Sequence, residues 1–265
     1  MYKKNTCLLS IVLPTYERIE GLEMLLLNID IDLLKDGVIE LVVTDDSLTD
    51  LVESYCNVNE YLLYTRHKNT KNPVDNWNNG LKIAQGRYVQ VLHHDEYPAS
   101  HFTYNQIVSS LEEKEYSVII PRCYFLEGNQ EPVKRIMQSF IAQRFALFFP
   151  YFLLGFNVIG SPSLFIYRNK GELFNPELTY LVDVNFYFNK IIKPHVRSNI
   201  LLSESAFLSD TLFLNSITNS LGEKLGSTTL MEQNYILSRN GQSFSERILM
   251  KFVFMFRNFV NKVRH

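Results

Sequence analysis

The segment that decides the fold is NPVDNWNNGLKIAQGRYVQVLHHDE, which spans Asn72–Glu96. Its first two residues are typical of a helix start, because an asparagine side chain caps free backbone N–H groups and proline fits the first helical turn. Apolar residues then recur at helical spacing until Gly86, where the helical pattern ends. The apolar run Tyr88–Leu92 follows and indicates a buried strand. The segment therefore predicts a helix that leads into a strand with a polar cluster at its end.

Upstream segments show the same alternation of strand and helix. Buried-strand patterns occur at Cys7–Pro14, Val38–Thr44 and Tyr61–Thr65, and Ile19–Leu34 has apolar residues at helical spacing. Such alternation is typical of a mostly parallel sheet with helices on both faces. We find no internal repeat and no low-complexity linker. The sequence therefore predicts an α/β fold.

The composition indicates a folded chain and excludes several classes of protein. The 265 residues include 26 lysines and arginines against 28 acidic residues, so we expect no nucleic acid among the partners. Hydrophobic residues make up 46% of the chain, which excludes a disordered protein. Cys7, Cys56 and Cys123 are too few and too scattered for a disulfide scaffold, and they predict free thiols in a reducing cytoplasm.

Three segments bear on contact with a membrane. Phe145–Phe156 is apolar but too short to cross a bilayer, and it predicts a buried helix. Met1–Asn5 precedes a short apolar run without a cleavage site, so no signal peptide is expected. Phe244–His265 places phenylalanines at helical spacing and carries a net charge of +4. This pattern fits either a terminal helix packed on the domain or a helix lying on an anionic membrane surface.

Several common chemistries lack their sequence signatures. None of the 11 glycines forms a G-x-G pair, and no G-x-x-x-x-G-K-[ST], H-E-x-x-H or G-x-S-x-G motif occurs. These absences count against a dinucleotide-dependent dehydrogenase, a P-loop kinase, a zinc protease and an α/β-hydrolase. The polar residues after the predicted strands must therefore serve another chemistry.

Polar clusters follow three of the predicted strands, namely Pro14-Thr15-Tyr16-Glu17, Asp45-Asp46-Ser47 and His93-His94-Asp95-Glu96. Ligands of α/β sheets bind outside the carboxyl ends of parallel strands, so the clusters predict one site. A tyrosine offers an aromatic face, aspartates accept hydrogen bonds from a base or ribose, and an acidic cluster holds a divalent cation against phosphates. Together they predict a nucleoside-diphosphate site with a bridging metal. The simpler alternative is that Asp45 and Asp46 form a turn and helix cap, and that the histidines are solvated.

The sequence resembles the family-2 glycosyltransferases, which are inverting enzymes with the GT-A fold. The strongest matching segments are SIVLPTYER (Ser10–Arg18), ELVVTDDSLTD (Glu40–Asp50) and the quoted segment Asn72–Glu96. Weaker matches are GSPSLFIYR (Gly160–Arg168) and LVDVNFYF (Leu181–Phe188). The resemblance implies a single Rossmann-like mixed sheet flanked by helices, with a helical C-terminal extension. The motifs are those of the bacterial polysaccharide and O-antigen type.

The resemblance also implies a division of the chain and a set of binding residues. Residues 1–120 would form the nucleotide-sugar-binding half of a GT-A domain, and residues 121–215 the half that binds the acceptor and carries the catalytic base. Residues 216–265 would form the C-terminal extension with its amphipathic basic helix. The implied nucleotide-sugar-binding residues are Pro14, Thr15, Tyr16, Glu17, Asp45, Asp46, Asn76 and His94.

Two aspartates would carry the chemistry by the same resemblance. Asp95 falls where the family's D-x-D motif ends and would hold Mn²⁺ or Mg²⁺, although a histidine replaces the first carboxylate. Asp183 falls on the acidic residue of the family's E-D motif and would be the catalytic base, although Val182 replaces the glutamate. Such a base takes the proton from an acceptor hydroxyl that attacks the sugar C1 from the far face. The product would be β-linked from an α-linked donor.

The expected function is therefore transfer of a sugar from a nucleotide-diphosphate sugar to a hydroxyl group. We expect a UDP-sugar, with GDP and dTDP left open, and a lipid-linked or polysaccharide acceptor in cell-surface polysaccharide synthesis. The protein would work in the cytoplasm, with peripheral attachment to the inner face of the cell membrane left open. Two alternatives remain: a catalytically degenerate homologue that only binds a nucleotide-sugar, and a sugar nucleotidyltransferase.

Overall fold

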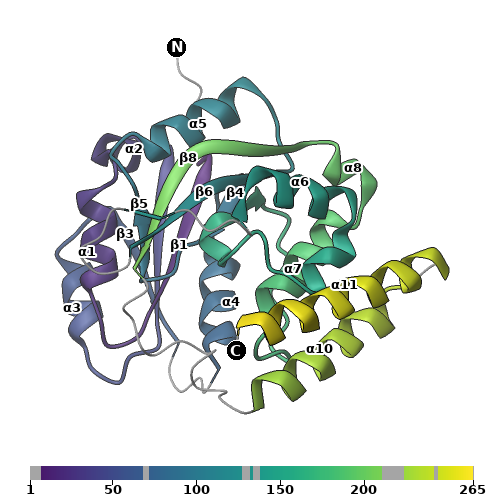
Figure 1. The fold of residues 1–265 in the computed structure, drawn as a ribbon. Helices are drawn as coiled ribbons and strands as arrows, with labels where there is room; N and C mark the ends of the chain where they lie inside the picture. The colour runs from purple at the N-terminus through teal and green to yellow at the C-terminus, as the bar shows by residue number, and fades with distance from the viewer. Residues whose placement is uncertain are drawn as a thin grey trace.

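The fold is taken from a computed structural model, which describes residues 7–67, 72–126, 132–133, 138–210, 224–241 and 244–264. The N-terminal segment examined for a signal peptide lies outside these residues. One mixed sheet of eight strands runs through the described part of the chain, in the order β3-β2-β1-β4-β7-β6-β8-β5 (Figure 1). Its strands are β1 (Leu9–Thr15), β2 (Ile39–Asp45), β3 (Leu62–Arg66), β4 (Tyr88–Val91), β5 (Glu96–Pro98), β6 (Val118–Leu126), β7 (Ile166–Arg168) and β8 (Ile200–Asp210).

The sheet divides into a parallel half and a mixed half. β1 pairs in parallel with β2 and β4, and β2 with β3, which confirms the four predicted strands to within two residues at each end. β7 is antiparallel to β4 and β6, β6 is parallel to β8, and β5 is antiparallel to β8. The predicted single mixed sheet is therefore confirmed. The predicted boundary at residue 120 stays a prediction, and the one at residue 215 lies outside the described residues.

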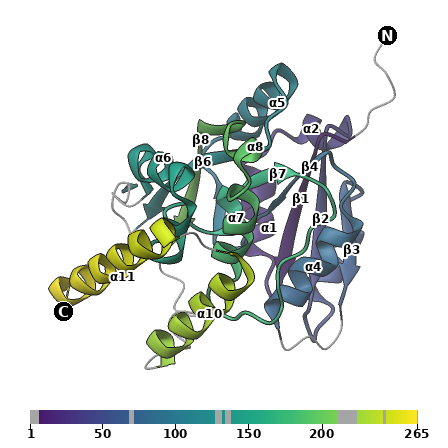
Figure 2. The ribbon, with the colours of Figure 1, turned by 90° about the vertical axis from the view of Figure 1, so that its right-hand side faces the viewer.

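Helices cover both faces of the sheet and extend beyond one end of it (Figure 2). Short 3-10 helices are written η. The helices are α1 (Glu20–Leu27), α2 (Ile31–Lys35), α3 (Leu51–Asn57), α4 (Pro73–Ile83), α5 (Thr103–Glu113), α6 (Phe140–Phe148), η2 (Pro150–Leu154), η3 (Pro162–Leu164), α7 (Val182–Ile191), α8 (Pro194–Arg197), α10 (Leu225–Arg239) and α11 (Phe244–Arg264). Both figures show α10 and α11 side by side, which confirms the predicted helical C-terminal region.

Two apolar cores hold these layers together. Leu9, Ile11 and Leu13 of β1 enter the core that α1, α2, α3 and α5 cover. Val12, between them, enters the other core with α4 and α7. Alternate side chains of a strand point to opposite faces, so a strand buried on both faces must be apolar throughout. This requirement explains the apolar run that predicted β1, in which Ser10 is the one polar residue and accepts a hydrogen bond from Gly86 N at 2.7 Å.

The predicted helix Ile19–Leu34 is wrong as a single element, because the structure divides it into α1 and α2. At the break, Asn28 Nδ2 donates a hydrogen bond to Met24 O at 2.9 Å. Asp30 caps α2 by accepting a hydrogen bond from Asp32 N at 3.2 Å. Asn and Asp side chains compete for backbone groups in this way, so they end one helix and start the next.

The predicted buried helix Phe145–Phe156 is also wrong in part. α6 ends at Phe148, and Pro150 begins the short helix η2. The residue before a proline is pushed out of the helical conformation, which explains the break. The side chain of Phe148 is 84% exposed, and Phe145 is also exposed, whereas the η2 residue Leu154 is buried. The first part of this apolar run therefore contributes Ala146 to the core and leaves two phenylalanines exposed, whereas most of η2 is buried.

The C-terminal helix α11 packs on the domain along one side only. Met250 and Val253 are buried, and α11 contacts η2. Phe252 between them is 61% exposed, and Met255 is also exposed. In the described parts of the chain, no helix combines the length and the apolar character that crossing a bilayer requires.

Candidate active site

The predicted strand-end clusters of β1 and β2 meet at one edge of the sheet. Thr15 and Asp45 are paired at the ends of the two strands, and Thr15 Oγ1 donates to Asp45 Oδ1 at 3.2 Å. Asp46 N donates to Thr15 O at 3.2 Å. The structure therefore brings two of the three predicted clusters into direct contact.

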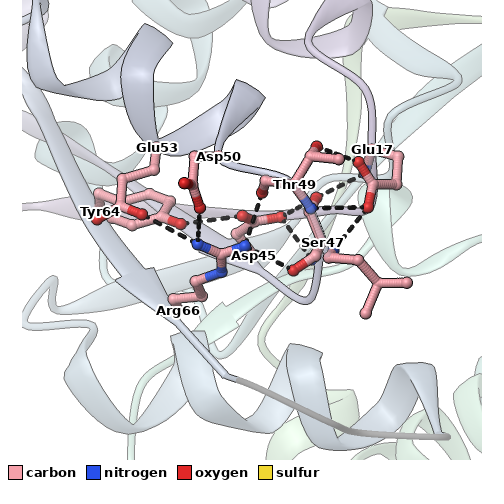
Figure 3. Close-up of polar contacts among 9 residues, drawn as sticks. Glu17, Asp45, Ser47, Thr49, Asp50, Glu53, Tyr64 and Arg66 are labelled. Carbon is pink, nitrogen blue, oxygen red and sulfur yellow. Dashed lines mark hydrogen bonds and ion pairs between the residues drawn. The ribbon is translucent and has the colours of Figure 1, made fainter.

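The carboxylate of Asp45 is fully buried and organises the end of β2 (Figure 3). Besides Thr15, it accepts hydrogen bonds from Ser47 N at 3.0 Å and from Tyr64 OH at 2.9 Å. The bond from Ser47 N forms the turn that was the simpler interpretation of this aspartate. A direct role of Asp45 in binding base or ribose stays a prediction.

Glu17 holds the loop after β2 from the other side (Figure 3). Its backbone has a φ of 55°, and its carboxylate accepts hydrogen bonds from Leu48 N at 2.6 Å and Thr49 N at 3.1 Å. A further hydrogen bond from the Thr49 hydroxyl is the main cause that lowers the pKa of Glu17. The neighbouring Tyr16 is 58% exposed, so its ring is accessible to a ligand.

Arg66 completes this framework, a role that no sequence motif predicted. Its guanidinium donates to Ser47 O at 2.9 Å and to Thr49 O at 2.6 Å. It also forms an ion pair with Asp50 at 2.6 Å. The loop that follows β2 is thus tied to β3, so the base-and-ribose end of the predicted pocket is built on rigid elements.

Asn76 and Pro14 lie in the scaffold under the site. Asn76 Nδ2 donates to Thr15 O at 3.2 Å and to Thr44 O at 3.1 Å, and its Oδ1 accepts from Thr44 Oγ1 at 2.8 Å. These bonds tie α4 to β1 and β2 and occupy the amide group. Pro14 is buried in β1. Ligand binding by either residue stays a prediction.

The third cluster, after β4, contains a candidate metal site. His93, Asp95 and Glu96 each offer a ligand atom, and these atoms lie within 4.8 Å of one another. His93 Nε2 is buried without a hydrogen-bond partner among the described residues. Burial lowers the pKa of His93 to about 4, so its imidazole is neutral at pH 7, as metal ligation requires. The neighbouring His94 is exposed and does not belong to this group.

The close approach of α1 helps to place this cluster. A Cβ added to Gly21 of α1 would lie 2.5 Å from His94 O and 2.8 Å from His94 Cα. Only glycine allows the helix and the strand-end backbone to come this close. The turn that carries His93 and Asp95 is therefore packed directly against α1.

The second half of the chain is tied to the same cluster by serines. Ser161 Oγ donates to Glu96 Oε1 at 2.7 Å, and His93 N donates to Ser163 Oγ at 2.8 Å. Burial, followed by the nearby Asp95 carboxylate, raises the pKa of Glu96 to about 7. Both serines belong to the weaker matching segment GSPSLFIYR. The predicted donor half and acceptor half therefore share this cluster.

Asp183 lies in the first turn of α7, as a candidate base should if it is to be held rigidly. Asn157 Nδ2 donates to its Oδ2 at 2.8 Å, and Val184 N donates to its Oδ1 at 2.7 Å. Burial raises the pKa of Asp183 from 3.8 to about 7. A carboxyl group with such a pKa exchanges protons efficiently near neutral pH.

One cavity of about 270 Å³ joins Asp183 to the strand-end cluster, because Asp183 and His93 both line it. Trp77 lies between core and cavity: it is 8% exposed, and its ring centroid is 4.9 Å from that of His93. Trp77 and Leu81 both belong to the core. A candidate base and a candidate metal ligand therefore line the same cavity.

A buried glutamate that sequence reasoning missed anchors the segment before Asp183. Glu232 of α10 is 2% exposed. Its two oxygens accept hydrogen bonds from Thr179 N at 2.6 Å, Tyr180 N at 3.1 Å and Leu181 N at 2.7 Å. Because Leu181 directly precedes α7, Glu232 positions the turn that carries Asp183. A lone glutamate in a distant helix has no local pattern that predicts this contact.

Comparisons with known proteins identify the family and the fold. Residues 10–172 match the family model described as Glycosyl transferase family 2. No curated protein matches the chain significantly in sequence.

Among solved structures, TarS 1-349 from S. aureus in complex with UDP-GlcNAc is similar with a TM-score of 0.63 and 17% identity, over 96% of this chain and 73% of TarS 1-349. The mannosyltransferase PcManGT from Pyrobaculum calidifontis, in complex with GDP-Man and Mn²⁺, has a TM-score of 0.58 and 14% identity, over 94% and 69% of the two chains. Glucosyl-3-phosphoglycerate synthase from Mycobacterium tuberculosis, with Mn²⁺, UDP and its product, has a TM-score of 0.53 and 15% identity, over 86% and 80%. At these identities the likeness shows the fold.

Proposed function

This chain belongs to glycosyl transferase family 2, and from that premise we propose that it is an inverting, metal-dependent enzyme that uses a UDP-sugar. The observation that carries the proposal is the single cavity lined by Asp183 and His93. Asp183 is the general base, and its raised pKa suits that role at neutral pH. The donor preference is supported by the complexes of similar folds with UDP-GlcNAc and UDP, while a complex with GDP-Man keeps GDP open.

In the proposed reaction, Asp183 accepts the proton of an acceptor hydroxyl while that oxygen forms a bond to the donor C1. The bond between C1 and the diphosphate oxygen breaks, and the electron pair leaves with the nucleoside diphosphate. Attack from the face opposite the leaving group inverts the configuration at C1. Asn157 and the first turn of α7 hold the carboxylate in one orientation during the step. Such positioning is worth several kcal/mol in enzymes.

The residues of the strand-end cluster fit a bound divalent cation. His93 Nε2 is a buried nitrogen without a hydrogen-bond partner among the described residues, and Asp95 offers a carboxylate oxygen in the same group. A mixed set of imidazole and carboxylate suits Mn²⁺ better than Mg²⁺, which prefers oxygen ligands alone. His93, Asp95 and Glu96 would hold the ion. Bound there, it would offset the charge that develops on the leaving diphosphate.

Thermal unfolding with nucleotides tests the donor site directly. We expect UDP with Mn²⁺ to raise the melting temperature by about 5 °C or more at a hundredfold excess over Kd, because ligands that bind only the folded state stabilise it. GDP and dTDP serve as competitors that identify the base. Asp95→Ala should remove the metal-dependent part of the shift.

The matched control is Asp32→Ala, which removes a surface carboxylate that pairs with Lys35. It should retain the whole nucleotide shift. If no nucleotide stabilises the wild-type chain with Mn²⁺ or Mg²⁺, the donor assignment is wrong. If nucleotides stabilise it but no transfer or donor hydrolysis occurs, the degenerate binding protein becomes the better description.

For the acceptor, we propose a lipid-linked or polysaccharide hydroxyl used in cell-surface polysaccharide synthesis, with peripheral attachment to a membrane. The support is a pair of exposed apolar faces that both adjoin η2. On α6 the exposed side chains are Ile141, Phe145 and Phe148, and on α11 they are Ile248, Leu249, Phe252 and Met255. Basic residues accompany those of α11, which favours an anionic surface.

Vesicle sedimentation tests the membrane part of the proposal. We expect the chain to sediment with vesicles that contain phosphatidylglycerol and to stay in solution with phosphatidylcholine alone. Phe252→Glu should lower the sedimented fraction severalfold, because a charge replaces an inserted ring. The control is Val58→Glu, which changes an apolar side chain that is 80% exposed at the end of α3. This variant should not change the sedimented fraction. If the wild-type chain does not sediment with anionic vesicles, the proposed membrane attachment is wrong. The proposed donor site does not depend on this result.

A further inference from the structure

Arg257 of α11 lines the cavity that contains Asp183, and the proposed donor chemistry does not use it. Its charge is also not engaged in an ion pair within the described residues. The arginines that form such pairs there are Arg66, Arg87, Arg122, Arg168 and Arg239. A guanidinium that faces a substrate cavity without a carboxylate partner is available to a ligand.

The position of Arg257 is determined by how α11 packs. Val253 and Met250 are buried against the domain. Val253 packs so closely on η2 that its Cγ1 would lie 2.5 Å from a Cβ added to Gly155. Residues four apart lie on the same face of a helix, so Arg257 follows Val253 on the face that meets the domain. Gly155 lines the same cavity, so this contact places Arg257 at the cavity wall.

The charged side chains that line the cavity indicate the charge of the ligand that it binds. Asp183 must be ionised to act as a base, which disfavours an acceptor whose own negative charge is uncompensated. A guanidinium in the same cavity provides that compensation, because its fork of N–H donors matches the oxygens of a phosphate. In the proposed function the diphosphate of the donor would bind through a cation held by His93, Asp95 and Glu96, whereas Arg257 belongs to the wall formed by η2 and α11.

We propose that Arg257 binds a phosphate group of the acceptor, so that the acceptor is a phosphorylated sugar, polyol or lipid. This inference rests on the proposed function and specifies its acceptor. It also makes α11 part of the active site, because the helix supplies a side chain that selects the substrate. The membrane-facing side chains and Arg257 then occupy different faces of one helix.

The test uses glycerol 3-phosphate as the charged probe and glycerol as the uncharged one. Binding is measured as the shift in melting temperature of the full chain at saturating UDP and Mn²⁺, so that the diphosphate site is filled. We expect glycerol 3-phosphate, and not glycerol, to stabilise the wild-type chain. Arg257→Ala should weaken this binding at least about tenfold, as expected for loss of a charge-assisted hydrogen bond.

Arg247→Ala is the matched control, since Arg247 is exposed on the same helix and does not line the cavity. It should bind glycerol 3-phosphate as the wild type does. Arg257→Glu reverses the charge and should abolish binding while leaving the UDP shift unchanged, which shows that the variant is folded.

Three results would overturn the inference or separate it from the proposed function. If Arg257→Ala weakens UDP instead of glycerol 3-phosphate, Arg257 binds the donor and the inference is wrong, while the function stands. If UDP stabilises the wild type and glycerol 3-phosphate does not, the phosphate site is likewise disproved. If glycerol 3-phosphate binds through Arg257 but UDP does not bind, the phosphate site is supported and the proposed function fails.

Discussion

Asp183→Asn should lower kcat for sugar transfer by about 10²–10⁴-fold, because an amide cannot accept the proton of the acceptor hydroxyl. Binding of UDP should persist, since Asp183 lines the cavity and the proposed nucleotide-binding residues Thr15 and Asp45 do not. Initial rates with a UDP-sugar, together with the UDP-induced shift in melting temperature, measure the two effects separately. A variant that binds UDP and transfers at the wild-type rate would show that another group is the base.

The pH dependence follows from the same carboxyl group. Burial raises the pKa of Asp183 to about 7, so wild-type kcat/KM should rise as pH increases towards 7 and level off above it. The variant Asp183→Asn should not show this rise of kcat/KM with pH. In the folded chain this pKa lies above the unfolded value, so the stability that protonated Asp183 contributes at low pH is lost as pH rises from about 4 to 7. Asp183→Asn should therefore not be less stable than the wild type at pH 8.

Other acidic residues near α7 are poorly placed to replace Asp183. Glu172 forms an ion pair with Lys190 at 2.6 Å. Glu177 accepts a hydrogen bond from the Tyr235 hydroxyl and lies near Arg239. Neither lines the cavity, so we expect glutamine at either position to leave the pH limb of transfer unchanged.

Glu232→Ala should cause the largest loss of stability, at least about 3 kcal/mol, because it leaves three backbone N–H groups without an acceptor in a buried place. These groups belong to Thr179, Tyr180 and Leu181, which lead into the turn of Asp183. Transfer should fall as well, since a base displaced by even 1 Å loses much of its effect. Urea unfolding measures the free energy, and initial rates measure the transfer.

The variant Glu232→Gln tests whether Glu232 tunes the base Asp183 or only stabilises the fold. The negative charge of Glu232 contributes to the raised pKa of Asp183, so the neutral variant should move the acid limb of kcat/KM to lower pH. Glu177→Gln, which removes an exposed carboxylate from the same region, should leave the limb in place and cost little. If Glu232→Gln lowers stability without moving the limb, Glu232 is structural and does not tune the base.

The predictable part of the site consists of residues next to the strand ends. Thr15 and Asp45 follow apolar runs, and parallel strands that are neighbours in a sheet bring their ends together, so their contact was foreseeable. Arg66 and Glu232 were not, because each acts on backbone groups that belong to another element. An arginine at a strand end or a glutamate in an amphipathic helix looks like an ordinary surface residue until the chain is folded.

The sequence by itself determined the parallel half of the sheet, the α4 start at Asn72 and the three polar clusters, because local capping and apolar periodicity specify these features. Tertiary structure alone decided that His93 and Asp183 share one cavity and that α11 brings Arg257 to its wall. It also decided that α10 brings Glu232 to the backbone that leads into Asp183. These residues lie far apart along the chain, and their meeting depends on side-chain packing across helices. No local pattern encodes such packing, because it is the folded core that selects which distant faces fit together.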